Sequence, residues 1–80
     1  MKNFDEALAD FDKSIQIGPS RWGYVQRGQV LCDMGRHAEA APDYHNARIY
    51  AEKEGVENVD EWDALVSLRN ALIENKVKLD

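Results

Sequence analysis

The chain has 80 residues, with 15 acidic against 10 basic side chains, and a formal net charge of −5. This charge disfavours phosphate backbones and anionic membrane surfaces, so we expect no nucleic-acid partner and no membrane partner. The length allows a single domain, residues 1–80, with a small core. Cys32 is the only cysteine, which excludes a disulfide within the chain and suits a reducing compartment, so we expect a cytoplasmic protein.

The first predicted helix covers residues 4–17. Asn3 can cap its first turn, with Glu6 in the spacing of a capping box. Gly18 can take a left-handed conformation and Pro19 cannot continue a helix, so we expect the helix to end there. Four residues at helical spacing form its apolar face: Phe4, Leu8, Phe11 and Ile15.

The second and third predicted helices cover residues 21–34 and 37–54. The link between them is only two or three residues long, which predicts an antiparallel pair. Gly28 lies inside the second helix, where glycine costs about 1 kcal/mol relative to alanine. We therefore expect a close approach of another helix there, with Ala40 on the facing side. Pro42 removes a backbone hydrogen bond from the third helix, which predicts a late start or a bend.

The fourth predicted helix covers residues 59–77. Asn58 can cap it, again with a glutamate, Glu61, in capping-box spacing. Its broad apolar side is made of Trp62, Leu65, Val66, Leu68, Leu72 and Ile73. No segment of the chain alternates with a period of two, so the sequence predicts an all-α fold of four helices.

An internal repeat relates the first helix to the third by a shift of 33 residues. The shift aligns Glu6 with Glu39, Ala7 with Ala40, Asp10 with Asp43, Phe11 with Tyr44, and Ser14 with Ala47. The repeated pattern places an aromatic residue between two small ones. Small residues let a neighbouring helix approach, and the aromatic ring fills the wider gap between them.

The stretch "YVQRGQVLCDMGRHAEAAPDYHNA", residues 24–47, resembles a tetratricopeptide repeat, a helix–turn–helix unit of about 34 residues. Its signature positions are occupied by Tyr24, Gly28, Leu31, Gly35, Ala40, Tyr44 and Ala47. Arg27 departs from the pattern, because the family usually has a leucine there. The resemblance implies antiparallel helix pairs stacked into an α-solenoid with a right-handed superhelix. It also implies that the helix over 4–17 is the second half of an earlier repeat, whose open face could support a homodimer.

Tetratricopeptide arrays bind peptide or protein segments in a concave groove lined by the first helix of each repeat. The resemblance therefore implies a groove lined by Trp22, Val25, Gln29, Cys32, Asp33, Asp63, Ser67 and Asn70. An acidic, partly apolar groove favours a neutral or basic amphipathic partner. For each of these residues the alternative is a structural one, in which Trp22 packs in the core and the polar side chains are merely solvated.

The leading hypothesis is thus a protein-interaction module without catalysis. The alternative is a small homo-oligomeric helical bundle whose apolar faces serve self-assembly. An enzyme is not favoured, because the sequence offers no constellation of acid, base and nucleophile, and no cofactor motif. Asp33 and His37 are four residues apart, but a helix break at Gly35 argues against a shared metal ion. Cys32 has no neighbouring base, so we interpret it as a partly buried cysteine without a reactive role.

Overall fold

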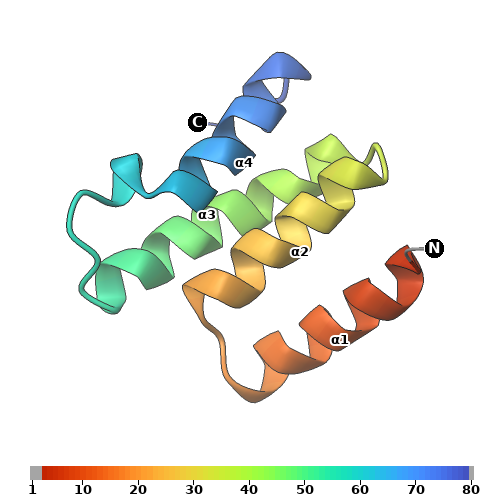
Figure 1. The fold of residues 1–80 in the computed structure, drawn as a ribbon, viewed down its shortest axis with the longest axis horizontal. Helices are drawn as coiled ribbons and strands as arrows, with labels where there is room; N and C mark the ends of the chain where they lie inside the picture. Colours follow the sequence, from red (N-terminus) through yellow and green to blue (C-terminus); the bar gives the residue numbers. More distant parts are fainter. Residues whose placement is uncertain (1–2, 80) are drawn as a thin grey trace.

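A computed structural model describes residues 3–79, which form four α-helices and one turn of 3-10 helix (Figure 1). In chain order these are α1 (Phe4–Ile17), α2 (Arg21–Asp33), α3 (His37–Lys53), η1 (Val59–Glu61) and α4 (Asp63–Glu74). No strand occurs among the described residues, so the predicted all-α class with four helices is confirmed. The bounds of α1, α2 and α3 agree with the predicted ranges to within one residue.

Short polar side chains begin the first two helices. The Oδ1 atom of Asn3 accepts a hydrogen bond from the amide of Glu6 at 3.2 Å. The Oγ atom of Ser20 accepts one from the amide of Gly23, also at 3.2 Å. Each bond satisfies an amide of the first turn that has no partner within the helix, and so fixes where the helix begins.

The connection between α1 and α2 differs from the prediction. Gly18 has φ −153° and ψ 92°, so the expected left-handed conformation is wrong. The reason is Pro19, whose ring drives the preceding residue into extended backbone. The amide of Gly18 still donates to the carbonyl of Ser14 at 2.9 Å, which closes the last turn of α1.

The other three helices all end with a left-handed residue, at Gly35, Gly55 and Lys76, with φ of 78°, 81° and 61°. The amide after each one bonds to a carbonyl five residues earlier, as Arg36 does to Leu31 at 2.8 Å. This is the Schellman arrangement, which satisfies carbonyls that the helix leaves free. At Lys76 it ends α4 before the predicted limit of 77.

The beginning of α4 also differs from the prediction of a helix over 59–77. Asn58 is left-handed with φ 51° and makes no side-chain cap bond, so the predicted capping box with Glu61 is wrong. Trp62 has extended backbone, which separates η1 from α4. That break lets the Trp62 ring meet the Trp22 ring edge-to-face, with centroids 5.0 Å apart. Such an aromatic pair contributes about 0.5–1.5 kcal/mol beyond its buried area, which is comparable to the capping bond that is lost.

Pro42 lies inside α3, which begins at His37, so the expected late start is wrong. The helix gives up the hydrogen bond that a proline cannot donate. Three residues around it compensate by being buried on one side of α3: Ala40, Asp43 and Tyr44. Packing of this side against α2 keeps the helix continuous through the proline.

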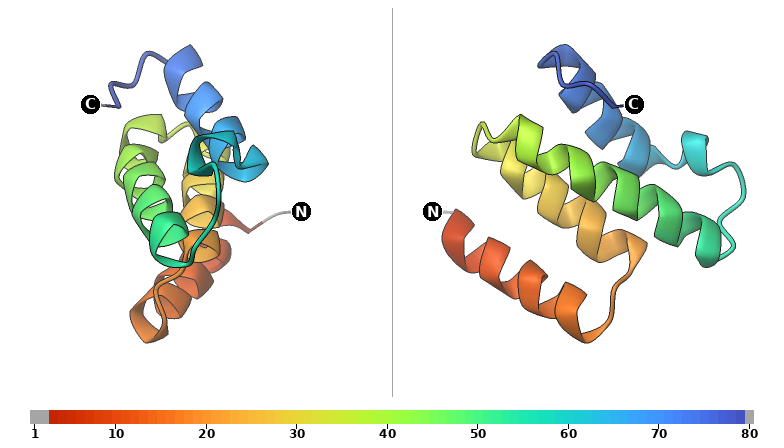
Figure 2. Two further views of the ribbon diagram at one scale, coloured as in Figure 1. Left: turned by 90° about the vertical axis from the view of Figure 1, so that its left-hand side faces the viewer. Right: turned by 180° about the vertical axis from the view of Figure 1, so that it is seen from behind.

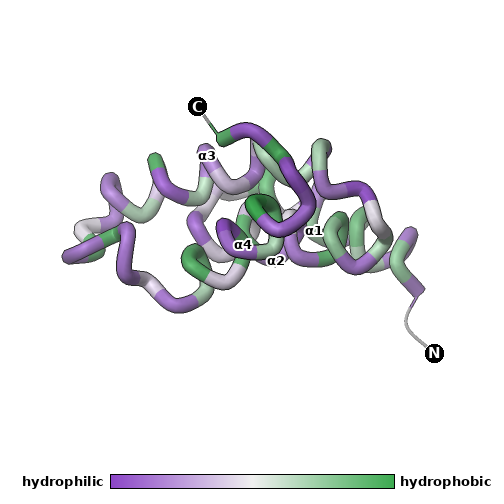
Figure 3. The backbone as a smooth tube through the Cα atoms, turned by 90° about the horizontal axis from the view of Figure 1, so that it is seen from above, coloured by the Kyte–Doolittle hydropathy of each residue, from purple (hydrophilic) through white to green (hydrophobic). Residues whose placement is uncertain are grey.

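The helices are arranged around α2, which has α1 along one side and α3 along the other (Figures 1 and 2). The fourth helix packs across both α2 and α3. Within the described range, α2 is the only helix whose backbone lies directly beside that of α1. The connection between α3 and α4 is mostly hydrophilic (Figure 3) and carries several carboxylates, including Glu54, Glu57, Asp60 and Glu61.

The core lies where α2, α3 and α4 meet, and α1 attaches to its edge. It is made of Val25, Leu31, Ala40, Tyr44, Ala47, Leu65, Leu68 and Leu72. Gly28 allows the closest approach: a Cβ atom built on it would lie 2.9 Å from Leu68 Cδ2 and 3.3 Å from Asp43 Cβ. The predicted close approach at Gly28 is therefore confirmed, but its partners are Leu68 and Asp43, where Ala40 was expected.

Candidate functional site

A hollow of about 310 Å³ lies between the C-terminal half of α2 and the middle of α4. Its lining consists of Gln29, Cys32 and Asp33 from α2 with Ser67, Leu68 and Ala71 from α4. The two helices can form it because the contact of Gly28 with Leu68 brings them together just beside it. The hollow is open to solvent and its rim is mainly polar, which suits a surface that receives a ligand rather than one that encloses it.

Four of the eight predicted groove residues line this hollow, namely Gln29, Cys32, Asp33 and Ser67. Trp22, Asp63 and Asn70 are exposed on the same two helices but do not line it. Val25 is fully buried, so its prediction as a groove residue is wrong. The reason is that α3 and α4 close over this side of α2, and Val25 joins Leu65 and Leu68 in the core.

A pair of tryptophans marks the other end of the same two helices. Trp22, which is 46% exposed, meets Trp62 at an interplanar angle of 89°. The guanidinium carbon of Arg21 lies 5.7 Å from the centroid of the Trp22 ring and 5.3 Å from that of Trp62. Arg21 is itself held by Glu54, whose carboxylate also accepts the Arg21 amide at 3.0 Å. Sequence spacing did not predict this pair, because the contact depends on the backbone break at Trp62.

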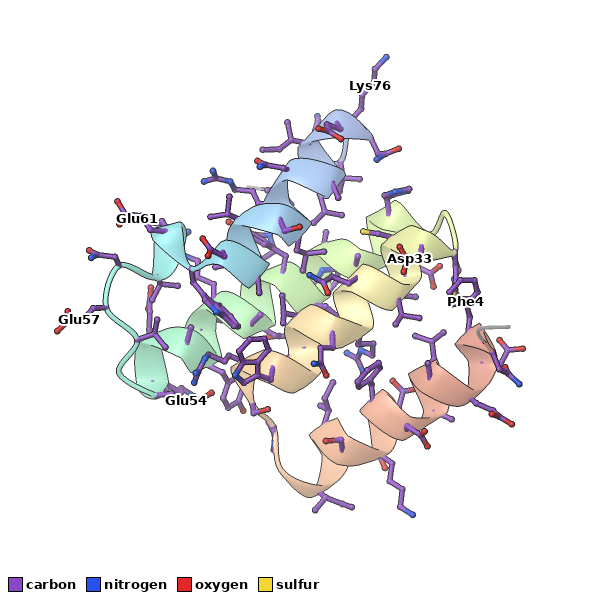
Figure 4. The ribbon with its side chains drawn as sticks, in the orientation of Figure 1. Phe4, Asp33, Glu54, Glu57, Glu61 and Lys76 are labelled. Atoms are coloured by element: carbon purple, nitrogen blue, oxygen red, sulfur yellow. The ribbon has the colours of Figure 1, made fainter. Side chains whose placement is uncertain are left out.

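The charge of the hollow comes from Asp33, which is exposed at the C-terminal end of α2 (Figure 4). No cation pairs with its carboxylate among the residues that the structure describes. The helix dipole is negative at this end, so it adds to the charge of Asp33. Burial, and then the neighbouring Asp33 carboxylate, raise the pKa of the Cys32 thiol. The thiolate is thereby disfavoured, which argues against a nucleophilic role for Cys32.

An ion-pair network around Arg27 was not predicted. Its Nε atom donates to both carboxylate oxygens of Asp43, at 3.1 and 3.0 Å, and its Nη1 atom donates to Asp12 at 2.8 Å. Asp43 is buried, with 1% exposure, and its hydrogen bond is the main cause that raises the pKa of Arg27. The network joins α1, α2 and α3, and its role is structural. The one sign of this network in the sequence is Arg27 itself, because a cation stands there at a position where the repeat pattern usually has leucine.

Two kinds of feature are absent from the described residues: a metal-binding cluster and a membrane-spanning helix. Among residues 3–79, no group of three or more histidine, cysteine, aspartate or glutamate side chains is placed to hold a metal ion. None of the helices in this range is both long and apolar enough to cross a membrane. A second hollow, of about 240 Å³, lies between α1, α2 and α3, but it surrounds the Arg27 network.

The sequence matches no protein-family model, and no curated protein or solved structure matches it either. A function must therefore be inferred from the hollow between α2 and α4, together with the resemblance of residues 24–47.

Proposed function

We propose that this chain is a tetratricopeptide-like interaction module that binds a peptide or protein segment along α2 and α4. In this proposal α2 and α3 are the antiparallel pair of one repeat, α1 is the second helix of an earlier repeat, and α4 is the first helix of a later one. The pairs then form part of a right-handed solenoid. No catalysis and no cofactor are assigned, and the single thiol suits the reducing conditions of the cytoplasm.

One observation carries the proposal: the hollow gathers Gln29, Cys32 and Asp33 of α2 with Ser67 of α4. The resemblance to the repeat predicts these four positions, and Asp33 and Ser67 are more than 30 residues apart in the chain. The polar rim, and the Asp33 carboxylate that has no ion-pair partner within residues 3–79, support a neutral or basic amphipathic segment as the partner.

The test is a selection of peptides from a fully randomised twelve-residue displayed library, followed by titration into the isotopically labelled protein. We expect the selected peptides to shift the amide resonances of residues 29–33 and 67–71. Asp33→Lys should weaken binding at least tenfold, because it puts a like charge against a basic peptide. Asp10→Lys is the matched control, the same charge change on α1 away from the hollow, and should leave the affinity within twofold. Shifts confined to α1, or equal affinity in Asp33→Lys, would contradict the proposal.

A homo-oligomeric bundle is the second candidate, and the surface of α1 favours it. Ile17 is 79% exposed, and a shallow hollow of about 440 Å³ lies beside it, lined by Asp10, Lys13, Ser14 and Gly18. Sedimentation velocity at micromolar concentrations separates the candidates. Self-association through α1 predicts a dimer that Ile17→Asp converts to a monomer, whereas a folded 9.1 kDa monomer at all concentrations removes this candidate.

A further inference from the structure

The surface that runs along α2 and α4 differs between its two ends. Trp22 and Asp33 are eleven residues apart, about three helical turns, so they project from the same side of α2. The hollow with Asp33 lies at the C-terminal end, and the exposed face of Trp22 lies at the N-terminal end. A ligand that follows this surface therefore meets a carboxylate at one end and an aromatic ring at the other.

Electrostatics favour a cation at the Asp33 end only. There the carboxylate has no ion-pair partner within the described range, and the negative end of the α2 dipole adds to it. At the opposite end, the carboxylate of Asp63 stands in the first turn of α4, where the positive end of the dipole offsets it. Glu57 and Glu61 point outward at the edge of the molecule, away from α2 (Figure 4).

The tryptophan end favours an apolar side chain. Arg21 already lies within 6 Å of both ring centroids, so a ligand cation placed on these rings would meet a like charge. What remains accessible is the exposed part of the Trp22 indole. An aromatic ring that is half exposed beside a fixed partner ring is a rigid contact surface for a large apolar group.

The distance between the two ends sets the spacing on the ligand. Eleven residues of α-helix extend about 16 Å, at 1.5 Å for each residue. An extended peptide covers about 3.3 Å for each residue, so about five of its residues span the same length. We propose that this surface takes an extended peptide with a lysine or arginine in the Asp33 hollow and a large apolar side chain about five residues away, against Trp22. This inference rests on the proposed function and adds the polarity and spacing of the ligand.

The test uses a displayed library of twelve-residue peptides with one fixed arginine at position six and all other positions randomised. We expect the enriched peptides to carry leucine, phenylalanine or tryptophan four to six positions from the arginine. Synthetic versions should bind Trp22→Ser about tenfold and Asp33→Asn about threefold more weakly than they bind the unmodified protein. Ile17→Ser removes an exposed apolar side chain on α1 and is the matched control, with no change expected.

Cys32 supplies a measurement that needs no variant. It is the only cysteine and lines the hollow, so a bound peptide should slow its alkylation at least fivefold. Two results would overturn this inference and leave the proposed function standing. In the first, the selected peptides shift the amides of residues 29–33 and 67–71 but show no preferred spacing. In the second, they bind Trp22→Ser with unchanged affinity while that variant keeps its helical circular dichroism. A library that yields no peptide shifting residues 29–33 and 67–71 overturns both.

Discussion

Replacing Arg27 with leucine is expected to lower the free energy of unfolding by about 3–5 kcal/mol, the usual cost of removing one partner from a buried ion pair. The substitution leaves the Asp43 carboxylate, whose side chain is 2% exposed, without the guanidinium that donates to both of its oxygens. A chain of this length has a total stability of roughly 4–12 kcal/mol, so the variant should be close to unfolding. Urea denaturation followed by circular dichroism measures the change.

Two further variants separate the contribution of the Arg27–Asp43 pair, whose carboxylate is buried, from that of the Arg27–Asp12 pair, whose carboxylate is exposed. The double variant Arg27→Leu with Asp43→Leu removes both charges, and we expect it to recover most of the lost stability, because well-packed apolar residues often replace a buried pair without cost. Asp12→Asn removes the partner that is 54% exposed and should cost less than about 1 kcal/mol. A double variant no more stable than Arg27→Leu would contradict the interpretation that unpaired charge causes the loss.

Gly28→Leu is expected to destabilise the fold by about 3 kcal/mol, at the upper end of typical overpacking costs. A β-carbon at this position would lie 2.9 Å from Leu68 Cδ2 and 3.3 Å from Asp43 Cβ, so a leucine can be accommodated only if these neighbours move. The melting temperature should fall by about 12 °C or more for a domain of this size. Differential scanning calorimetry is the measurement.

The control for this prediction is Gly18→Ala, because a β-carbon on Gly18 meets nothing within 4 Å and its backbone is extended. It should not lower the melting temperature. Combining Gly28→Leu with Leu68→Ala should cost less than the sum of the two single changes, since the new side chain fills the space that Leu68 leaves. Strict additivity would mean that these two residues do not meet.

The parts of the fold that depend on local signals were predictable. The capping side chain of Asn3 and the terminating residues Pro19 and Gly35 act within a few residues of themselves, and they place the ends of α1 and α2 correctly. The start of α4 was not predictable in this way. There the contact between Trp62 and Trp22 decides the backbone conformation, and the two residues are 40 positions apart.

The same distinction applies to the candidate site. Helical spacing indicates which residues share a side of α2, and Gln29, Cys32 and Asp33, which it groups together, line the same hollow. It does not indicate where a second helix crosses that side, and therefore Val25 was misplaced. The partnership of Arg27 with Asp43 escaped prediction for a related reason. A cation within an apolar pattern signals that a counter-ion is needed, but only the packing of α3 on α2 identifies it.

The position of α1, whose backbone lies directly beside α2 only, has a consequence for how the molecule opens. Undocking α1 breaks its contacts with α2 and the exposed half of the Arg27 network, while the core between α2, α3 and α4 stays intact. Its amides should therefore exchange with solvent deuterium through a partial opening that costs less free energy than global unfolding. We therefore expect α2, α3 and α4 to unfold together and α1 to detach before them.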